Sequence, residues 1–136
     1  MQIGIDFDGT CVTHEYPEIG KDIGAIPVLK ALVKNGHQLI LFTMRSDREV
    51  KTNFGAYREY FLSAAVTWFK ENNIPLYGIQ TNPEQRLWTD SPKAYANLYI
   101  DDAALGCPLI VPENSNERPY ADWETIKKML KEKGLI

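Results

Sequence analysis

Short, continuous apolar runs recur along the chain and constrain its fold more than any other feature of the sequence. They cover residues 2–6, 38–43, 76–80, 97–101 and 108–111. Runs of this length without a regular polar alternation are typical of strands that are covered on both faces. We therefore expect a buried sheet built from these five segments.

Helical patterns separate the apolar runs. A helix is predicted to begin near Pro27 and to end at Gly36, because proline suits a first helical turn and glycine suits a left-handed C-terminal cap. Asp122 is predicted to cap a last helix, and Ser91 followed by Pro92 is predicted to open a short one.

The segment after the second apolar run also predicts helix. Residues 46–49 (Ser-Asp-Arg-Glu) match a capping box. Gly55 interrupts the pattern, so the segment is consistent with two helices as well as with one. Apolar side chains follow at helical spacing, namely Tyr57, Phe61, Ala64 and Trp68.

Strands that alternate with helices predict an α/β fold. This order implies a central parallel sheet with helices on both faces, which is a three-layer, Rossmann-like arrangement. A chain of 136 residues has the length of one domain, so we expect residues 1–136 to form a single domain. Ligands of such sheets bind beyond the carboxyl ends of the strands.

Composition excludes several classes of protein. A net charge of -3 gives no reason to expect nucleic acid or an anionic membrane as partner. The longest apolar stretch in the middle of the chain, residues 39–42, is far below the ~20 residues that cross a bilayer, and no basic segment begins the chain. We therefore expect a cytoplasmic location. Cys11 and Cys107 are too few for a disulfide framework and lack the spacing of a zinc site.

Polar residues that could carry chemistry follow the predicted strands. A single Asp in such a position is usually a turn former or a helix cap, but several polar groups at one sheet edge are much rarer by chance. Crowded carboxylates repel one another unless a cation neutralises them, and oxygen ligands suit Mg²⁺. The residues are Asp6 and Asp8 after the first strand, Thr43 after the second, Lys93 before the fourth, and Asp101 and Asp102 after it.

These residues resemble four motifs of the haloacid dehalogenase-like (HAD) hydrolase superfamily. Residues 6–10 (Asp-Phe-Asp-Gly-Thr) resemble its DxDGT signature, and Phe42 with Thr43 resembles its second motif. Lys93 resembles the third-motif lysine, and residues 100–102 (Ile-Asp-Asp) resemble the acidic fourth motif. The resemblance covers most of the chain and implies the HAD-like fold.

The resemblance also implies a role for each matching residue. Asp6 would be the nucleophile, and Asp8 would be the general acid and base, with its backbone carbonyl on the metal. Thr43 and Lys93 would hold the phosphate, and Gly9 would let the chain approach the substrate closely. The acids expected around the Mg²⁺ are Asp6, Asp8, Asp101 and Asp102.

The intervals between the motifs are too short for a cap domain. Residues 11–26 suit a helical turn and a hairpin flap, and residues 81–92 suit a loop. The resemblance then implies a cap-less enzyme whose site is closed by a neighbouring subunit or stays open to a large substrate. Arg45, His14 and Trp88 are candidate substrate contacts, although Arg45 equally suits a solvated charge and Trp88 equally suits packing on the domain.

The predicted function is a Mg²⁺-dependent phosphatase that hydrolyses a phosphate monoester through an aspartyl phosphate. Its partner would be a small phosphate ester or a phosphorylated macromolecule, and a homo-oligomer is possible. The alternatives are a phosphotransferase and a non-catalytic phosphate-binding or interaction domain. A receiver domain is disfavoured because the third strand ends in Gln80 and Thr81 rather than in Asp, and the P-loop pattern is absent.

Overall fold

A four-stranded parallel sheet forms the centre of the computed structural model, which describes residues 1–114 and 116–136. The strands stand in the order β5-β2-β1-β6. This confirms an α/β fold with a central parallel sheet, and four of the five apolar runs supply its strands. These are β1 (Gln2–Ile5), β2 (Gln38–Leu41), β5 (Gly78–Ile79) and β6 (Leu98–Ile100).

The strand register brings the ends of β1 and β6 together. Ile5 pairs with Leu41 on one side and with Ile100 on the other. All four strands run in the same direction, so the residues that follow them meet at one edge of the sheet. Asp6 therefore lies beside the segment that begins with Asp101.

Three α-helices in the described residues pack on one face of this sheet. They are α1 (Ala25–Lys34), α2 (Phe61–Glu71) and α3 (Trp123–Glu132). Buried side chains from each helix join one core cluster, with Leu29, Phe69 and Leu130 among them. The sheet residues of that cluster include Ile5 and Leu41, which are paired in register and therefore share a face.

The opposite face of the sheet is covered by an irregular segment. A Cβ atom on Gly4 would lie 3.6 Å from the Cβ atom of Ala96, and a Cβ atom on Gly78 would lie 3.1 Å from the Pro83 ring. The helical turn of this covering segment is the 3₁₀ helix η1 (Gln85–Leu87). The expectation of helices on both faces is corrected accordingly, and the short helix expected at Ser91 does not form.

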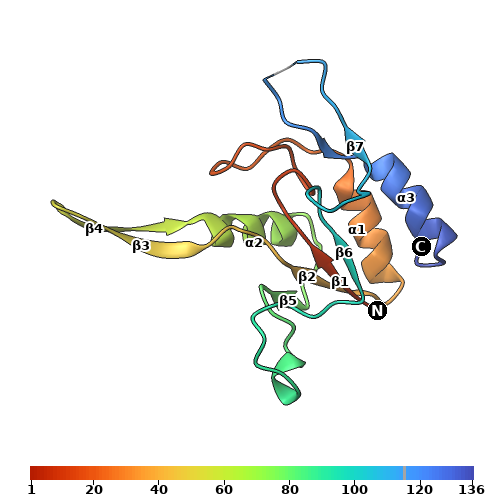
Figure 1. Ribbon diagram of the computed structural model, residues 1–136, viewed down its shortest axis with the longest axis horizontal. Coiled ribbons are helices and arrows are strands. Elements are labelled where there is room, and N and C mark those ends of the chain that lie inside the picture. The colour runs from red at the N-terminus through yellow and green to blue at the C-terminus, as the bar shows by residue number, and fades with distance from the viewer. Residues whose placement is uncertain (115) are drawn as a thin grey trace.

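A β-hairpin replaces the helix that was expected after β2. Strand β3 (Asp47–Thr52) pairs with β4 (Gly55–Tyr60), and the hairpin projects from the body of the molecule (Figure 1). The capping-box prediction at residues 46–49 is therefore wrong, and α2 begins only at Phe61. Phe54, in the turn of the hairpin, is fully exposed.

The last apolar run is a strand, but it does not join the central sheet. Strand β7 (Leu109–Ile110) pairs antiparallel with β8 (Tyr120–Ala121) in a separate two-stranded sheet. Backbone bonds hold this sheet near the loop after β1, because the Ala121 amide donates to the Gly9 carbonyl at 2.8 Å.

The two chain ends lie close together (Figure 1). His37 joins them, since one ring nitrogen is 3.0 Å from the N-terminal amine and the other is 2.9 Å from the Leu135 carbonyl. The predicted cap at Gly36 is confirmed, with φ of 86°. None of the helices in residues 1–114 and 116–136 has the length and apolar character needed to cross a membrane.

The predicted cap of α3 is confirmed and is testable. Asp122 accepts bonds from the amides of Glu124 and Thr125, and the Thr125 hydroxyl bond helps to hold the pKa of this carboxyl below its usual range. Asp122→Ala should lower the free energy of unfolding by about 1 kcal/mol at pH 7. This loss should shrink as the pH falls through the lowered pKa, because the acid then also loses its charge in the folded protein.

Urea unfolding of the wild type, Asp122→Ala and Asp122→Asn measures this effect. Asparagine caps a helix about as well as aspartate, so the Asn variant should keep most of the stability. Equal losses in the two variants would show that the charge, rather than the cap, stabilises α3.

Candidate functional site

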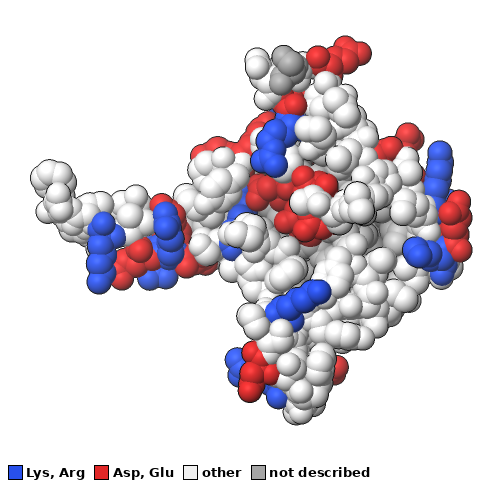
Figure 2. Space-filling view, in the orientation of Figure 1, with Lys and Arg blue, Asp and Glu red and all other residues white. Residues whose placement is uncertain are grey.

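A hollow opens at the carboxyl edge of the sheet, and acidic side chains gather in it (Figure 2). Its lining comes from the ends of three strands and from two surface loops. The lining residues are Asp6, Asp8, His14, Tyr16, Thr43, Met44, Arg45, Asp101, Asp102, Ala103 and Arg118.

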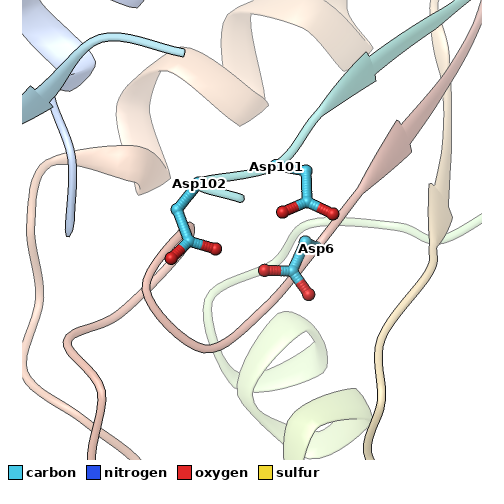
Figure 3. Close-up of side chains that lie close together, drawn as sticks. All are labelled: Asp6, Asp101 and Asp102. Atoms are coloured by element: carbon cyan, nitrogen blue, oxygen red, sulfur yellow. The ribbon is translucent and has the colours of Figure 1, made fainter. Parts of the chain in front are cut away.

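Three carboxylates converge in this hollow (Figure 3). Asp6 follows β1, and Asp101 and Asp102 follow β6. Each contributes one oxygen to a set in which all atoms lie within 4.8 Å of one another. Oxygen donors from two rigid strand ends are a set that suits a hard divalent cation such as Mg²⁺.

Thr10 holds these acids in place. Its hydroxyl donates to Asp6 Oδ2 at 2.9 Å and accepts from the Asp102 amide at 2.9 Å. The Thr10 carbonyl accepts from Trp123 Nε1 at 2.6 Å. Thr10 is fully buried, so this one residue joins the loop after β1 to the loop after β6 and to α3.

Burial and like charge raise the pKa of Asp6 to about 7. Removal from water is the largest cause, and the neighbouring Asp101 and Asp102 act in the same direction. The Thr10 hydroxyl bond opposes them. Among the described residues, no cationic side chain is thus bonded to Asp6, and a bound divalent cation would supply the compensating charge.

Gly9 is required by the backbone conformation of the loop after β1. A Cβ atom at this position would lie 1.9 Å from His14 Nε2 and 2.5 Å from Asp102 Oδ2. Its φ of 80° also lies in the left-handed region, which favours glycine. The Gly9 amide donates to the Val12 carbonyl at 2.7 Å, so it stabilises the loop itself.

Asp8 lies in the same hollow but is paired with Arg45. Arg45 Nε donates to Asp8 Oδ2 at 2.7 Å, and Arg45 Nη2 donates to Asp8 Oδ1 at 2.8 Å. Arg45 is only 1% exposed. The interpretation of Arg45 as a solvated charge is therefore wrong.

Thr43 lies in the hollow as expected, and a residue that the sequence analysis missed holds it there. The Gln80 side chain accepts from the Thr43 amide at 2.9 Å and donates to the Thr43 carbonyl at 2.7 Å. Gln80 entered the sequence analysis only in the argument against a receiver domain, which would have Asp at this strand end. Its position at the end of the third apolar run was the signal that could have placed it at the same sheet edge as Thr43.

Lys93 and Trp88 are not among the described residues that line the hollow. The Lys93 ammonium lies 5.6 Å from the centre of the Tyr99 ring. Trp88 packs edge-on against Tyr95, with the ring centres 5.5 Å apart. Trp88 is nevertheless 64% exposed, so this contact covers only part of its side chain.

His14 and Arg118 add nitrogen donors to the hollow. His14 Nε2 lies 2.8 Å from Asp102 Oδ2, which places this candidate substrate contact beside the acids. Arg118 was missed, because a charged residue in a loop between short strands carries no local signal of its position. Cys11 is buried in the core, where its thiol donates to the Asp6 carbonyl at 3.3 Å, and both cysteines are free.

One similar solved structure shows the family of this chain. It is described as a conserved protein from Bacteroides thetaiotaomicron, and it is 32% identical over 98% of this chain and 91% of that chain, with a TM-score of 0.69. This chain therefore belongs to the same family as that protein. No family model and no curated protein matches the chain. The description of the relative names no activity, so the activity has to be inferred from the site.

The raised pKa of Asp6 predicts how the metal-free protein responds to pH. The folded protein holds a proton on Asp6 up to about pH 7, whereas the unfolded chain releases it near 3.8. The wild type should therefore lose stability as the pH rises between these values. Asp6→Asn removes this loss, so in chelator it should exceed the wild type in unfolding free energy by up to ~4 kcal/mol above pH 7.

Urea unfolding in chelator from pH 4 to pH 8 measures this difference. The gain in Asp6→Asn should be small at pH 4 and should grow toward pH 7. Asp90→Asn, which changes an exposed carboxylate outside the hollow, is the matched control. A gain that does not vary with pH would contradict the assignment.

Proposed function

We propose that this protein is a Mg²⁺-dependent phosphatase of the HAD type that hydrolyses a phosphate monoester through an aspartyl phosphate on Asp6. The observation that carries the proposal is the convergence of Asp6, Asp101 and Asp102 at the carboxyl edge of the sheet. The sheet order supports the proposal because β6 lies next to β1, which brings together Asp6 and Asp101, the two acids that the resemblance assigns to the Mg²⁺.

The carboxylates of Asp6, Asp101 and Asp102 are the residues that would hold the Mg²⁺. Both carboxylate oxygens of Asp8 are paired with Arg45, so Asp8 would contribute through its backbone carbonyl rather than its side chain. When bound, the ion would neutralise these acids and the charge of the phosphate oxygens.

Asp6 is the group suited to attack phosphorus. The Thr10 hydroxyl fixes its Oδ2 atom, which leaves Oδ1 for the substrate. Asp6 Oδ1 would form a bond to phosphorus as the bond to the ester oxygen breaks, and water would then cleave the aspartyl phosphate. Asp8 would protonate the departing oxygen and later accept the proton of the attacking water.

Thr43 and Lys93 are the proposed phosphate-holding residues, and the structure supports them unequally. The Thr43 hydroxyl accepts from the Arg45 amide at 3.2 Å, so its own proton can be donated to a phosphate oxygen. Lys93 would have to leave the Tyr99 ring to reach the hollow, which makes it the weaker of the two assignments.

Water is the favoured acceptor of the phosphoryl group. The hollow is open, and residues 11–24 and 81–92, where a cap would be inserted, contain only loops, the 3₁₀ helix η1 and isolated bridges. The projecting hairpin of β3 and β4 is a two-stranded ribbon rather than a cap domain. A phosphotransferase has to exclude water, whereas an open site suits hydrolysis of a small ester or of a phosphorylated macromolecule.

A panel of phosphate esters tests the proposal. Sugar phosphates, nucleotides, phosphopeptides and p-nitrophenyl phosphate should be assayed with Mg²⁺ and with chelator. Hydrolysis should require Mg²⁺ and should be lost in Asp6→Asn but kept in Asp90→Asn. Mg²⁺ binding without turnover of any ester would instead support a non-catalytic phosphate-binding domain.

Asp8→Asn should separate the two chemical steps. An acid assists an alkoxide leaving group by ~10²–10⁴-fold but adds little for p-nitrophenolate. The variant should therefore lose most activity on alkyl phosphates and should release a burst of p-nitrophenol from the aryl ester. It should then stall with phosphate on Asp6, because no base activates the water.

Rapid-quench kinetics and mass spectrometry of the quenched protein measure the burst and the added phosphate. Equal losses on both kinds of ester, without a burst or added mass, would show that Asp8 is neither the acid nor the base.

A further inference from the structure

Arg45 has every N–H group of its guanidinium bonded within the protein. Two of them hold Asp8, as described above. Arg45 Nη1 donates to the carbonyls of Pro17 at 3.0 Å and Phe61 at 3.2 Å, and Nη2 donates to the carbonyl of Glu18 at 2.7 Å. These five bonds equal the full donor capacity of an arginine.

Two aromatic rings enclose the same guanidinium. Its central carbon lies 5.1 Å from the centre of the Phe7 ring and 5.2 Å from the centre of the Tyr16 ring. Phe7 is buried in the core, whereas Tyr16 is 57% exposed and lines the hollow. Arg45 thus joins Asp8 to residues 16–18 at the hollow and to the first residue of α2.

This geometry argues against a direct role of Arg45 in holding substrate. A phosphate could reach the guanidinium only by displacing Asp8 or a backbone carbonyl, and the displaced group would lose a buried, charge-assisted bond. Arg45 was predicted as a candidate substrate contact with a solvated charge as the equal alternative, whereas the structure shows a buried cation that is already fully bonded within the protein.

We propose that Arg45 is a positioning residue, which sets the direction of the Asp8 carboxylate and couples it to residues 16–18. Because Tyr16 both lines the hollow and packs on the guanidinium, a substrate that contacts Tyr16 acts on the same unit that holds Asp8. The activity part of this inference rests on the proposed phosphatase function, whereas the coupling between the segments does not.

Two substitutions of Arg45 and one matched control test the proposal. Arg45→Lys keeps the charge but not the fork of donors, and Arg45→Gln removes the charge. Arg48→Gln is the control, since Arg48 is exposed and pairs with Glu59 on the hairpin. With p-nitrophenyl phosphate, the Arg45 variants should slow the hydrolysis of the aspartyl phosphate, which is the step that needs Asp8. We therefore expect kcat to fall ~10-fold or more and KM to fall with it rather than to rise, because the covalent intermediate accumulates.

Combination with Asp8→Asn distinguishes positioning from substrate binding. If Arg45 acts through Asp8, Arg45→Lys should reduce kcat much less in the Asp8→Asn background than in the wild type. A rise in KM with kcat unchanged would show substrate binding and overturn the proposal, as would independent losses that multiply.

Hydrogen exchange supplies a readout that does not depend on activity. The amides of Thr13 and Lys21, which close the loop that contains residues 16–18 by bonding one another's residues at 3.0 Å and 2.8 Å, should exchange faster in Arg45→Lys than in the wild type and should be unchanged in Arg48→Gln. Unchanged exchange in Arg45→Lys would overturn the coupling. If the wild type hydrolysed no ester, the proposed function would fail while this result still decided the coupling.

Folding of the variants has to be checked, because Arg45 is buried. Tyr16→Leu keeps an apolar contact but removes the ring from the guanidinium, and its exposed position makes it the safer variant. It should also speed exchange of the Thr13 and Lys21 amides and lower kcat on p-nitrophenyl phosphate. Wild-type values of both quantities in Tyr16→Leu would overturn the link between the hollow and Asp8.

Discussion

The hydroxyl of Thr10 is the interaction on which the arrangement of the site depends. Parallel strands bring Asp6 and Asp101 to one sheet edge, but they do not fix how the loops beyond the strands turn. Thr10 does so, because it bonds the Asp6 side chain and the Asp102 amide, while its carbonyl holds the indole of Trp123. Its single proton can serve only one acceptor at a time, and the shorter distance, 2.9 Å against 3.3 Å, favours Asp6 over Asp102 Oδ1.

The sequence was sufficient to predict the centre of the fold and the acids at its edge. Residues 2–6 and 97–101 are apolar runs that end in acids, and burial on both faces of the sheet selects such runs wherever they occur. Once β1 and β6 are neighbours, the register leaves Asp6 and Asp101 little freedom. The α1 and α3 boundaries were also predictable, because Gly36 and Asp122 act through local backbone geometry.

The remaining features of the fold and the site depend on contacts between distant residues, which local sequence patterns do not encode. Residues 46–49 suit a capping box, but here Asp47 bonds Ser63 in α2 and begins a strand. The run at 108–111 pairs with β8 rather than with a strand of the central sheet, and nothing within the run distinguishes these two partners. The burial of Arg45 could not be predicted for the same reason. Three of its hydrogen-bond acceptors are the backbone carbonyls of Pro17, Glu18 and Phe61, and every residue has a backbone carbonyl, so no residue type marks these partners. Lys93 matched a motif by its order in the chain, but its ammonium group lies over the Tyr99 ring.

The charges of the hollow explain why its four acids are not equivalent. Asp8 has a buried guanidinium as partner, and Asp102 has the ring of His14 within 2.8 Å. Asp6 has neither, and its most direct support is a neutral hydroxyl, so burial and the neighbouring carboxylates raise its pKa to about 7. A cation that enters the hollow would therefore be stabilised most by the Asp6 carboxylate and least by the Asp8 carboxylate. The same division would leave the Asp8 carboxylate free of the metal, as the proposed acid and base must be, with Arg45 bonded to both of its oxygens.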